Sequence, residues 1–264
     1  NEEALIAMEV LGRNPKEAIE CQKLNLELLM IRGEKEAQKL INEVISGTID
    51  IETKKGQKTF TDTWEKSCPN LPMPYVSPNN FWYLTQLKNK RIVSNLSGEP
   101  QPAASNFENN QFLWVDNWKE QDFNANNAPE SHQSQLVRQL LNNESVVNHS
   151  REEIDRALWT GDPAKHEPTK RHLKILENLH IDPKKFELRL IRHDEYARSA
   201  KTKKWGQKNL WTNFEDYFLG DGRARGGLAG GCRDNGGPSY VGYYLWRDSA
   251  RDSLAVRFVL LRKG

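Results

Sequence analysis

The sequence predicts an α+β fold of short helices and strands, with antiparallel strands concentrated at the end of the chain. Residues 1–46 place apolar side chains at helical spacing between Glu, Lys and Gln. Short aromatic runs within residues 48–134 indicate strands joined by long loops, and an apolar strand follows a glycine-rich stretch at the C-terminus. Because helices and strands do not alternate regularly, we do not expect a parallel βαβ array.

The N-terminal part, residues 1–47, is predicted to be a helical segment appended to a main domain of residues 48–264. Asn14-Pro15 begins a second helix in this segment, since proline suits the first helical position, and Gly47 ends it. In the main domain, the aromatic runs predicted to be strands are residues 81–84 and 112–115.

Helical patterns return in the second half of the chain. Ser150 occupies the N-cap position of one helix, and Glu153 completes a capping box there. Residues 186–191, FELRLI, are predicted to be a strand, and residues 201–208 a basic linker. The four predicted helices cover residues 135–147, 151–159, 169–179 and 193–200.

Composition and motifs restrict the possible functions. The 264 residues carry a formal net charge of +2, which gives no global attraction to nucleic acid or membranes. The three cysteines are far apart, so neither a disulfide framework nor a zinc site is expected. No signal peptide opens the chain, and no apolar run reaches the roughly 18 residues of a membrane span.

No common catalytic motif is present, so we predict no catalytic residue, cofactor or metal ligand. The chain lacks a G-x-S-x-G elbow, an H-E-x-x-H pair and a Walker loop. Residues 222–227 precede no helical pattern and are predicted to be a turn, not a phosphate loop. A calcium loop at residues 114–117 and a nucleic-acid patch of lysines around Trp205 are weaker alternatives, and no nucleic-acid partner is expected.

The end of the chain has an unusual composition. Nine of the 17 glycines fall within residues 220–242. Residues 226–261 contain no Lys, Glu, Gln or Met, although these types make up 57 of the first 225 residues, a rate that predicts about nine here. Arg and Asp are retained. A tight β region explains the glycines and the lack of long flexible side chains, which cost more entropy to order. It explains less well why Arg is kept but Lys is missing, and why Asp is kept but Glu is missing.

The stretches ARGGLAGGCRDNGG and WRDSARDSLAVRFVLL resemble the closing segment of the formylglycine-generating type of C-type lectin fold. In that family a GG turn precedes an irregular surface and a terminal strand, which here is Val256-Arg257-Phe258-Val259-Leu260. Leu188-Arg189-Leu190 with Asp194-Glu195-Tyr196-Ala197 is similar to the family's R-L-P-T-E-x-E-W-E-Y-A segment, without its Pro and Trp.

The branches of this family differ in chemistry. The oxidase branch depends on two active-site cysteines, whereas this chain has only Cys232 in the corresponding region, and the iron-dependent branch needs clustered histidines. The non-catalytic branch contains the variable proteins of diversity-generating retroelements. The resemblance therefore implies a non-enzymatic protein of C-type-lectin-like fold that displays a hypervariable region, about residues 226–261, to a variable ligand, expected to be a protein.

The same resemblance explains the missing residue types. These systems randomise adenines of a template, mostly in Asn codons that end in a pyrimidine. Such codons can become Asn, Asp, Ser, Gly, Tyr or Arg, but never Lys, Glu, Gln, Met or Trp. Trp246 is therefore expected to be a fixed scaffold residue together with Val256, Phe258 and Leu260, and Arg257 is expected to support the frame.

Other residues of the tail divide into turn formers and binding candidates. The candidates are of types that binding loops use, because Tyr offers rigid amphipathic area and small polar groups offer adaptable hydrogen bonds. The predicted turn formers are Gly226, Gly227, Gly230 and Gly231. The ligand-binding candidates are Asp234, Asn235, Ser239, Tyr240, Tyr243, Tyr244, Arg247, Asp248, Asp252 and Leu254.

Two other functions stay open at this point. An oxidase or related enzyme of the same fold would depend on Cys232. An assembly protein would use its helical N-terminus for oligomerisation or attachment, and the sequence does not determine the oligomeric state.

Overall fold

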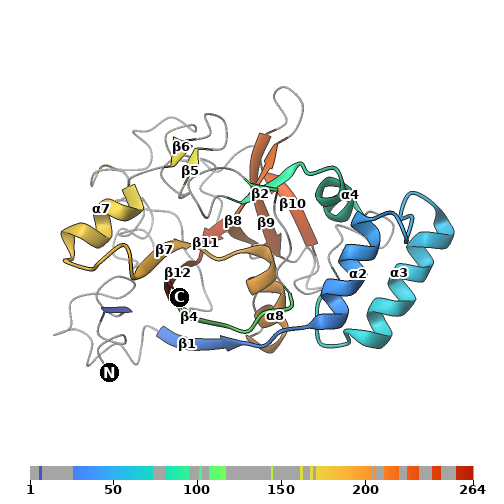
Figure 1. Ribbon diagram of the computed structural model, residues 1–264, viewed down its shortest axis with the longest axis horizontal. Helices are drawn as coiled ribbons and strands as arrows, with labels where there is room; N and C mark the ends of the chain where they lie inside the picture. Colours follow the sequence, from blue (N-terminus) through green and yellow to red (C-terminus); the bar gives the residue numbers. More distant parts are fainter. Residues whose placement is uncertain are drawn as a thin grey trace.

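The computed structural model has the α+β architecture expected from the sequence, with helices around two larger, mainly antiparallel sheets (Figure 1). Helices α2, α3 and α4 lie at one end of the molecule and α7 at the other. The structure describes residues 6–7, 26–73, 81–94, 101–102, 107–116, 144, 161–162, 167–168, 171–203, 205, 211–219, 225–231, 240–244 and 254–263.

The C-terminal strand lies inside a four-stranded sheet of order β1-β4-β12-β7, in which every neighbouring pair is antiparallel. Val259 pairs with Val115 on one side and with Arg189 on the other. Phe258, Val259 and Leu260 are at most 2 % exposed, so the end of the chain is anchored in the sheet. The strands are β1 (Leu26–Ile31), β4 (Gln111–Asp116), β12 (Phe258–Arg262) and β7 (Phe186–Leu190).

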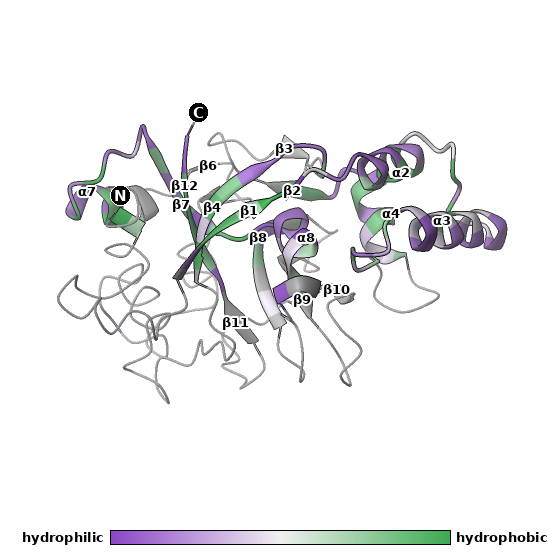
Figure 2. Cartoon of the chain, turned by 90° about the horizontal axis from the view of Figure 1, so that it is seen from below, coloured by the Kyte–Doolittle hydropathy of each residue, from purple (hydrophilic) through white to green (hydrophobic). Residues whose placement is uncertain are grey.

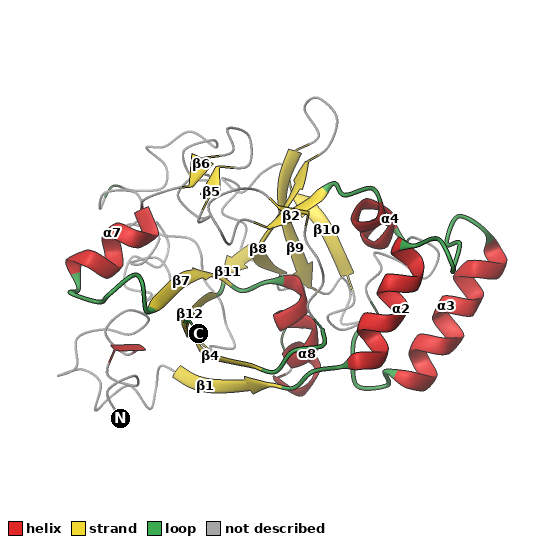
Figure 3. Ribbon diagram, viewed as in Figure 1, coloured by secondary structure: helices red, strands yellow, loops and turns green. Residues whose placement is uncertain are grey.

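A second, six-stranded sheet carries the glycine-rich part of the chain. Its order is β10-β9-β8-β2-β3, and β11 runs parallel to β8 beside residues 211–213 (Figure 3). A separate two-stranded sheet pairs β5 with β6. The strands are β2 (Ile92–Ser94), β3 (Gln101–Pro102), β5 (Gly161–Asp162), β6 (Glu167–Pro168), β8 (Trp211–Leu219), β9 (Arg225–Gly231), β10 (Tyr240–Tyr244) and β11 (Leu254–Val256).

The helices have identifiable ends and buried faces. Helix α2 buries Ala37, Leu40, Ile41 and Val44, which recur at helical spacing. Gly47 follows it with a φ of +81°, as predicted for the residue that ends this helix, because glycine adopts the left-handed conformation without a steric penalty. The helices are α2 (Lys35–Ile45), α3 (Lys54–Ser67), α4 (Trp82–Lys88), α7 (Arg171–Asn178) and α8 (His193–Lys203).

The main core joins these helices to both sheets. Helix α3 is largely hydrophilic along its length and buries Phe60 and Trp64 (Figure 2). The two rings stack with centroids 5.5 Å apart, and Phe81 meets Phe60 edge-on at 5.8 Å. This core also contains Val259 of β12 and Phe214 of β8, so it connects the helical end of the molecule to the strands of the tail.

Two local predictions were wrong. Residues 26–31 form strand β1, although residues 1–46 were predicted to be helical. The largely apolar run LELLMI pairs with β4 and buries the alternate residues Leu29 and Ile31. Residues 82–88 form helix α4, although residues 81–84 were predicted to be a strand. Its buried residues Tyr83, Leu84 and Leu87 follow helical spacing, which the short aromatic run did not reveal.

The predicted turn formers Gly226, Gly227, Gly230 and Gly231 also required correction, because all four lie in strand β9. Pairing with β8 on one side and β10 on the other satisfies the backbone of this strand, and this overrides the low strand propensity of glycine.

Several other predictions for the second half are confirmed: α7 lies within residues 169–179, β7 within residues 186–191, and α8 begins at His193. Residues 201–203 belong to α8 and not to a linker. The strand predicted at residues 256–260 is divided at Arg257 into the end of β11 and the start of β12. The predicted helices at residues 135–147 and 151–159, and the caps Asn14-Pro15 and Ser150, lie outside the described residues.

Candidate functional site

Strands β9 and β10 form an antiparallel pair at one edge of the six-stranded sheet. Tyr240 pairs with Gly231, Tyr243 with Leu228, and Tyr244 with Gly227. Three of the predicted binding residues are thus on one edge strand. Residues 232–239, which connect the two strands, lie outside the described residues.

The other predicted binding residues fall into two groups. Leu254 begins strand β11 and pairs with Trp211 on β8. Strand β8 therefore joins the two described parts of the candidate surface, since it lies between β9 and β11 at residues 211–213. The candidates outside the described residues are Asp234, Asn235, Ser239, Arg247, Asp248 and Asp252.

Strand β8 carries a bulge that turns acidic side chains into the interior. Its register to β9 shifts between Asn213, which pairs with Ala229, and Tyr217, which pairs with Gly227. Four steps along β8 therefore oppose two steps along β9, and residues 214–216 fill the difference. Glu215 and Asp216 within this bulge are 1 % and 4 % exposed, respectively.

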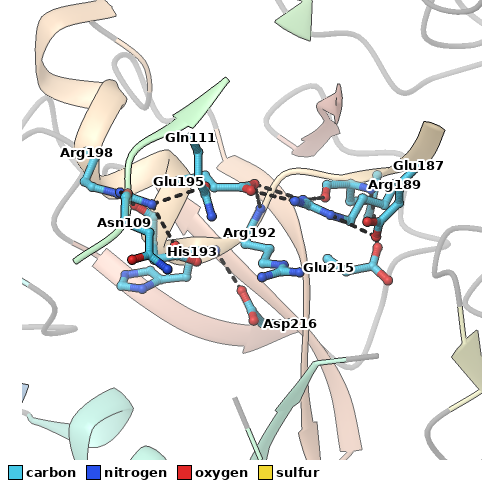
Figure 4. Close-up of polar contacts among 12 residues, drawn as sticks. Asn109, Gln111, Glu187, Arg189, Arg192, His193, Glu195, Arg198, Glu215 and Asp216 are labelled. Carbon is cyan, nitrogen blue, oxygen red and sulfur yellow. Dashed lines mark hydrogen bonds and ion pairs between the residues drawn. The ribbon is translucent and has the colours of Figure 1, made fainter. Parts of the chain in front are cut away.

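These two carboxylates hold the connection between β7 and α8 (Figure 4). The backbone N–H of Leu190 donates to Glu215 Oε2 at 3.3 Å, and Glu215 N–H donates to the carbonyl of Ile191 at 3.0 Å. The N–H of His193, the first residue of α8, donates to Asp216 Oδ2 at 2.7 Å. A carboxylate at this position satisfies a backbone donor at the start of a helix and interacts favourably with its dipole.

A buried ion pair joins β7 to α8. Arg189 Nη1 and Nη2 donate to Glu195 Oε2 and Oε1 at 2.9 and 2.5 Å, and Arg192 N–H donates to Oε2 at 3.0 Å. Both side chains are at most 2 % exposed. Burial alone would raise the pKa of Glu195. The charge of the Arg189 guanidinium outweighs this effect, so the pKa of the Glu195 carboxyl lies below its ordinary value. Glu187 approaches Arg189 Nε at 3.2 Å.

A second buried arginine ties α8 to the four-stranded sheet. Arg198 pairs with Asp194 at 3.0 Å and also donates to the carbonyl of Asn109 at 2.6 Å and to Gln111 Oε1 at 3.2 Å. Burial, and next the charge of Glu195, raise the pKa of Asp194 to about 7. The cluster therefore fixes α8 against both the bulge of β8 and the start of β4.

His193 lies among aromatic rings within this cluster. Its ring centroid is 4.3 Å from that of Tyr83 and 5.6 Å from that of Phe214. Burial lowers the pKa of His193 to about 3, so the imidazole is neutral at physiological pH. A histidine with this pKa is a poor general base near neutrality, and its contacts are those of a packing residue.

Arg257, one of the frame residues predicted in the tail, contacts the connection between β7 and α8. Arg257 is 1 % exposed, its guanidinium lies 4.1 Å from the centre of the Trp205 ring, and its carbonyl accepts from Ile191 N–H at 2.8 Å. The structural roles predicted for Phe258, Leu260 and Arg257 are thus confirmed. Val256 ends β11, and Trp246 lies outside the described residues.

The burial of Trp205 also bears on the nucleic-acid alternative. Trp205 is 4 % exposed and stacks on Tyr196 at 5.8 Å, so its ring face is occupied within the protein. Base stacking by this residue would require it to leave the core.

Reasoning from the sequence did not identify Glu215 and Asp216 as residues that hold the connection between β7 and α8. The signal was present, because two adjacent acids interrupt the aromatic run WTNFEDYFL. Charged residues in an otherwise apolar strand indicate either a solvated face or a buried polar network, and only the bulge decides between the two.

No protein-family model matches the chain, and neither does any curated protein or solved structure. In the described part of the chain, no helix is both long and apolar enough to cross a membrane. The described residues also contain no group of three or more His, Cys, Asp or Glu arranged to hold a metal ion.

Proposed function

We propose that the protein binds its ligand without catalysis, through a hypervariable C-terminal surface on a C-type-lectin-like scaffold. The observation that carries the proposal is the absence of Lys, Glu, Gln and Met from residues 226–261, in a chain rich in these types elsewhere. Adenine-directed diversification of Asn codons produces this restriction, whereas a requirement for short side chains would not select Arg over Lys so consistently.

The arrangement of the tail supports this proposal. Strand β9 is paired on both sides in the six-stranded sheet, and β12 is paired on both sides in the four-stranded sheet. The segment between these strands carries all ten binding candidates. Variation between two anchored strands leaves the core unchanged, as a surface that tolerates many sequences requires.

The composition of this segment suits recognition of a protein. Tyr240, Tyr243 and Tyr244 supply aromatic anchors of low conformational entropy, and the Asp, Asn, Ser and Arg candidates supply polar contacts around them. The buried cluster of Arg189, Glu195 and the β8 bulge would serve as a rigid support and not as a catalytic centre.

The decisive experiment compares the 36 codons of residues 226–261 with neighbouring DNA. We expect a near-repeat that differs at adenines, together with a gene for a reverse transcriptase. The absence of both would overturn the proposal. At the protein level, replacing Tyr240, Tyr243 and Tyr244 by alanine should abolish capture of a selected protein ligand, while the exposed control Lys58→Ala retains it.

A further inference from the structure

The β1 edge of the four-stranded sheet, opposite the edge formed by β7, carries an exposed apolar face. Leu28 and Met30 on β1 are 44 % and 48 % exposed, and Phe112 on β4 is 60 % exposed. Met30 pairs directly with Phe112, so the three side chains form one continuous patch, called here the β1 patch. The alternate residues Leu29 and Ile31 point into the core and are buried.

The face of the sheet that carries the β1 patch is covered where it is formed by β12 and β7. Leu260 on β12 pairs with Trp114 on β4 and with Leu188 on β7, so these three residues share the face of the β1 patch. Leu260 and Leu188 are at most 1 % exposed, and α7 packs against β7. Apolar side chains are therefore buried on one half of the face and exposed to solvent on the other.

The edge of β1 that faces away from β4 adds main-chain groups to this patch. Within the described part of the chain, β1 pairs with β4 only, and its other edge presents backbone N–H and C=O groups. Proteins commonly protect such edges with charges, but the only charged residue of LELLMI is Glu27. Glu27 is already paired with Lys203 of α8, so its charge does not oppose another strand.

We infer that this edge is a self-association surface, on which a second copy of the chain adds its own β1 in antiparallel orientation. A two-fold axis through Leu29 places Leu28 of one copy opposite Met30 of the other and keeps the apolar residues on one face. The patch is complementary to itself, and it offers no unpaired charge that would attract a charged partner.

The size of the patch sets the strength of this association. Three partly exposed side chains fall well short of the roughly 1,200 Å² that stable interfaces bury, so the strand pairing must contribute and the dimer must be weak. A dissociation constant on the order of 100 µM is expected. The β10 edge belongs to the other sheet and is not used, so the inference does not depend on the proposed function.

Sedimentation equilibrium of the full chain from about 5 to 500 µM tests the inference. The wild-type protein should shift from monomer toward dimer across this range. Leu28→Glu and Met30→Glu should each weaken dimerisation at least about tenfold, because each would place a charge opposite an apolar side chain across the two-fold axis. Both side chains are about half exposed, so folding should be retained, as circular dichroism can check.

Ile45→Glu is the matched control, since Ile45 is a 37 % exposed apolar residue on α2, outside the β1 patch. This variant should dimerise like the wild type. Hydrogen exchange identifies the pairing itself, because amides in residues 26–31 should gain protection as the concentration rises. A wild-type monomer at 500 µM would overturn the inference. So would a dimer that Leu28→Glu and Met30→Glu leave intact, or one without added protection in β1.

Discussion

Glu195→Gln removes the charge that compensates Arg189 while keeping the shape of the side chain. Glu195 accepts two hydrogen bonds from the Arg189 guanidinium and one from Arg192 N–H, and it is 1 % exposed. Removing one partner of a buried ion pair costs about 3–5 kcal/mol, because the other charge stays in the interior without compensation. Glu187 remains 3.2 Å from Arg189, so we expect the lower end of this range, about 3 kcal/mol.

Urea unfolding measures this loss. A cost of about 3 kcal/mol is a large part of the 5–15 kcal/mol by which domains are stable, and it should lower the midpoint by about 1 M urea. The control is Asp62→Asn, which breaks the Lys58–Asp62 pair on the surface of α3, where the side chains are 75 % and 58 % exposed. The control should leave the midpoint unchanged. Equal midpoints for both variants would refute the reasoning about the buried pair.

Three further predictions concern protonation, backbone space and thiol reactivity. The pKa of Asp194 is raised to about 7, so between about pH 4 and 7 the folded state binds more protons than the unfolded state, and this group adds stability as pH falls. The pKa of His193 is lowered to about 3, so this group removes stability as pH falls below about 6.5. Asp194→Asn should therefore lose stability more steeply than the wild type from pH 7 to 5, as urea unfolding at each pH will show. Gly33→Ala should destabilise the protein by about 1–3 kcal/mol, because an added Cβ would lie 1.9 Å from the Glu108 carbonyl oxygen, and thermal unfolding measures this. Cys68 should react with a thiol reagent at pH 8 only after unfolding, because it is 3 % exposed and burial raises its pKa to about 11.

Each of these predictions has a result that would count against it. Parallel pH profiles for Asp194→Asn and the wild type would mean that the carboxyl is ionised throughout. An unchanged melting temperature for Gly33→Ala would mean that the loop at Glu108 moves aside at no cost. Mass spectrometry of the peptide that contains Cys68 measures its modification. Modification in the native protein would mean that the surrounding helices open readily.

The spacing of apolar residues was sufficient to predict secondary structure where an element is amphipathic and has clear ends. Helix α2 ends before Gly47, and α7 and α8 follow their apolar periodicity, because side-chain spacing alone determines which face is buried. The pattern did not predict strand β1, because the run LELLMI is apolar except for Glu27 and has no period that separates a strand from a buried helix. The four glycines of β9 were wrongly predicted to form turns, because the pairing of this strand on two sides is a tertiary property that composition does not show.

The candidate site divides in the same way. Its unusual composition is visible in the sequence, because the missing Lys, Glu, Gln and Met and the retained Tyr, Asp and Arg can be recognised without a structure. The buried polar cluster beside strand β9 was not readable from the sequence, because the bulge of β8 that brings Glu215 and Asp216 to the start of α8 depends on a register shift against β9. Residues 188–197, whose resemblance to a family segment stays a prediction, contain Arg189 and Glu195, and the structure joins these two residues as a buried pair.

The sequence by itself determined the α+β class, the amphipathic helices and the unusual composition of the tail, since each depends on residues close together in the chain. Only the tertiary structure decided that the last strand lies at the centre of one sheet and that β10 lies at the edge of another. It also decided which charges are buried together, because Arg189 and Asp216 meet the same helix from different strands. These features depend on contacts between distant residues, whose partners are selected by packing and by the need to satisfy buried polar groups.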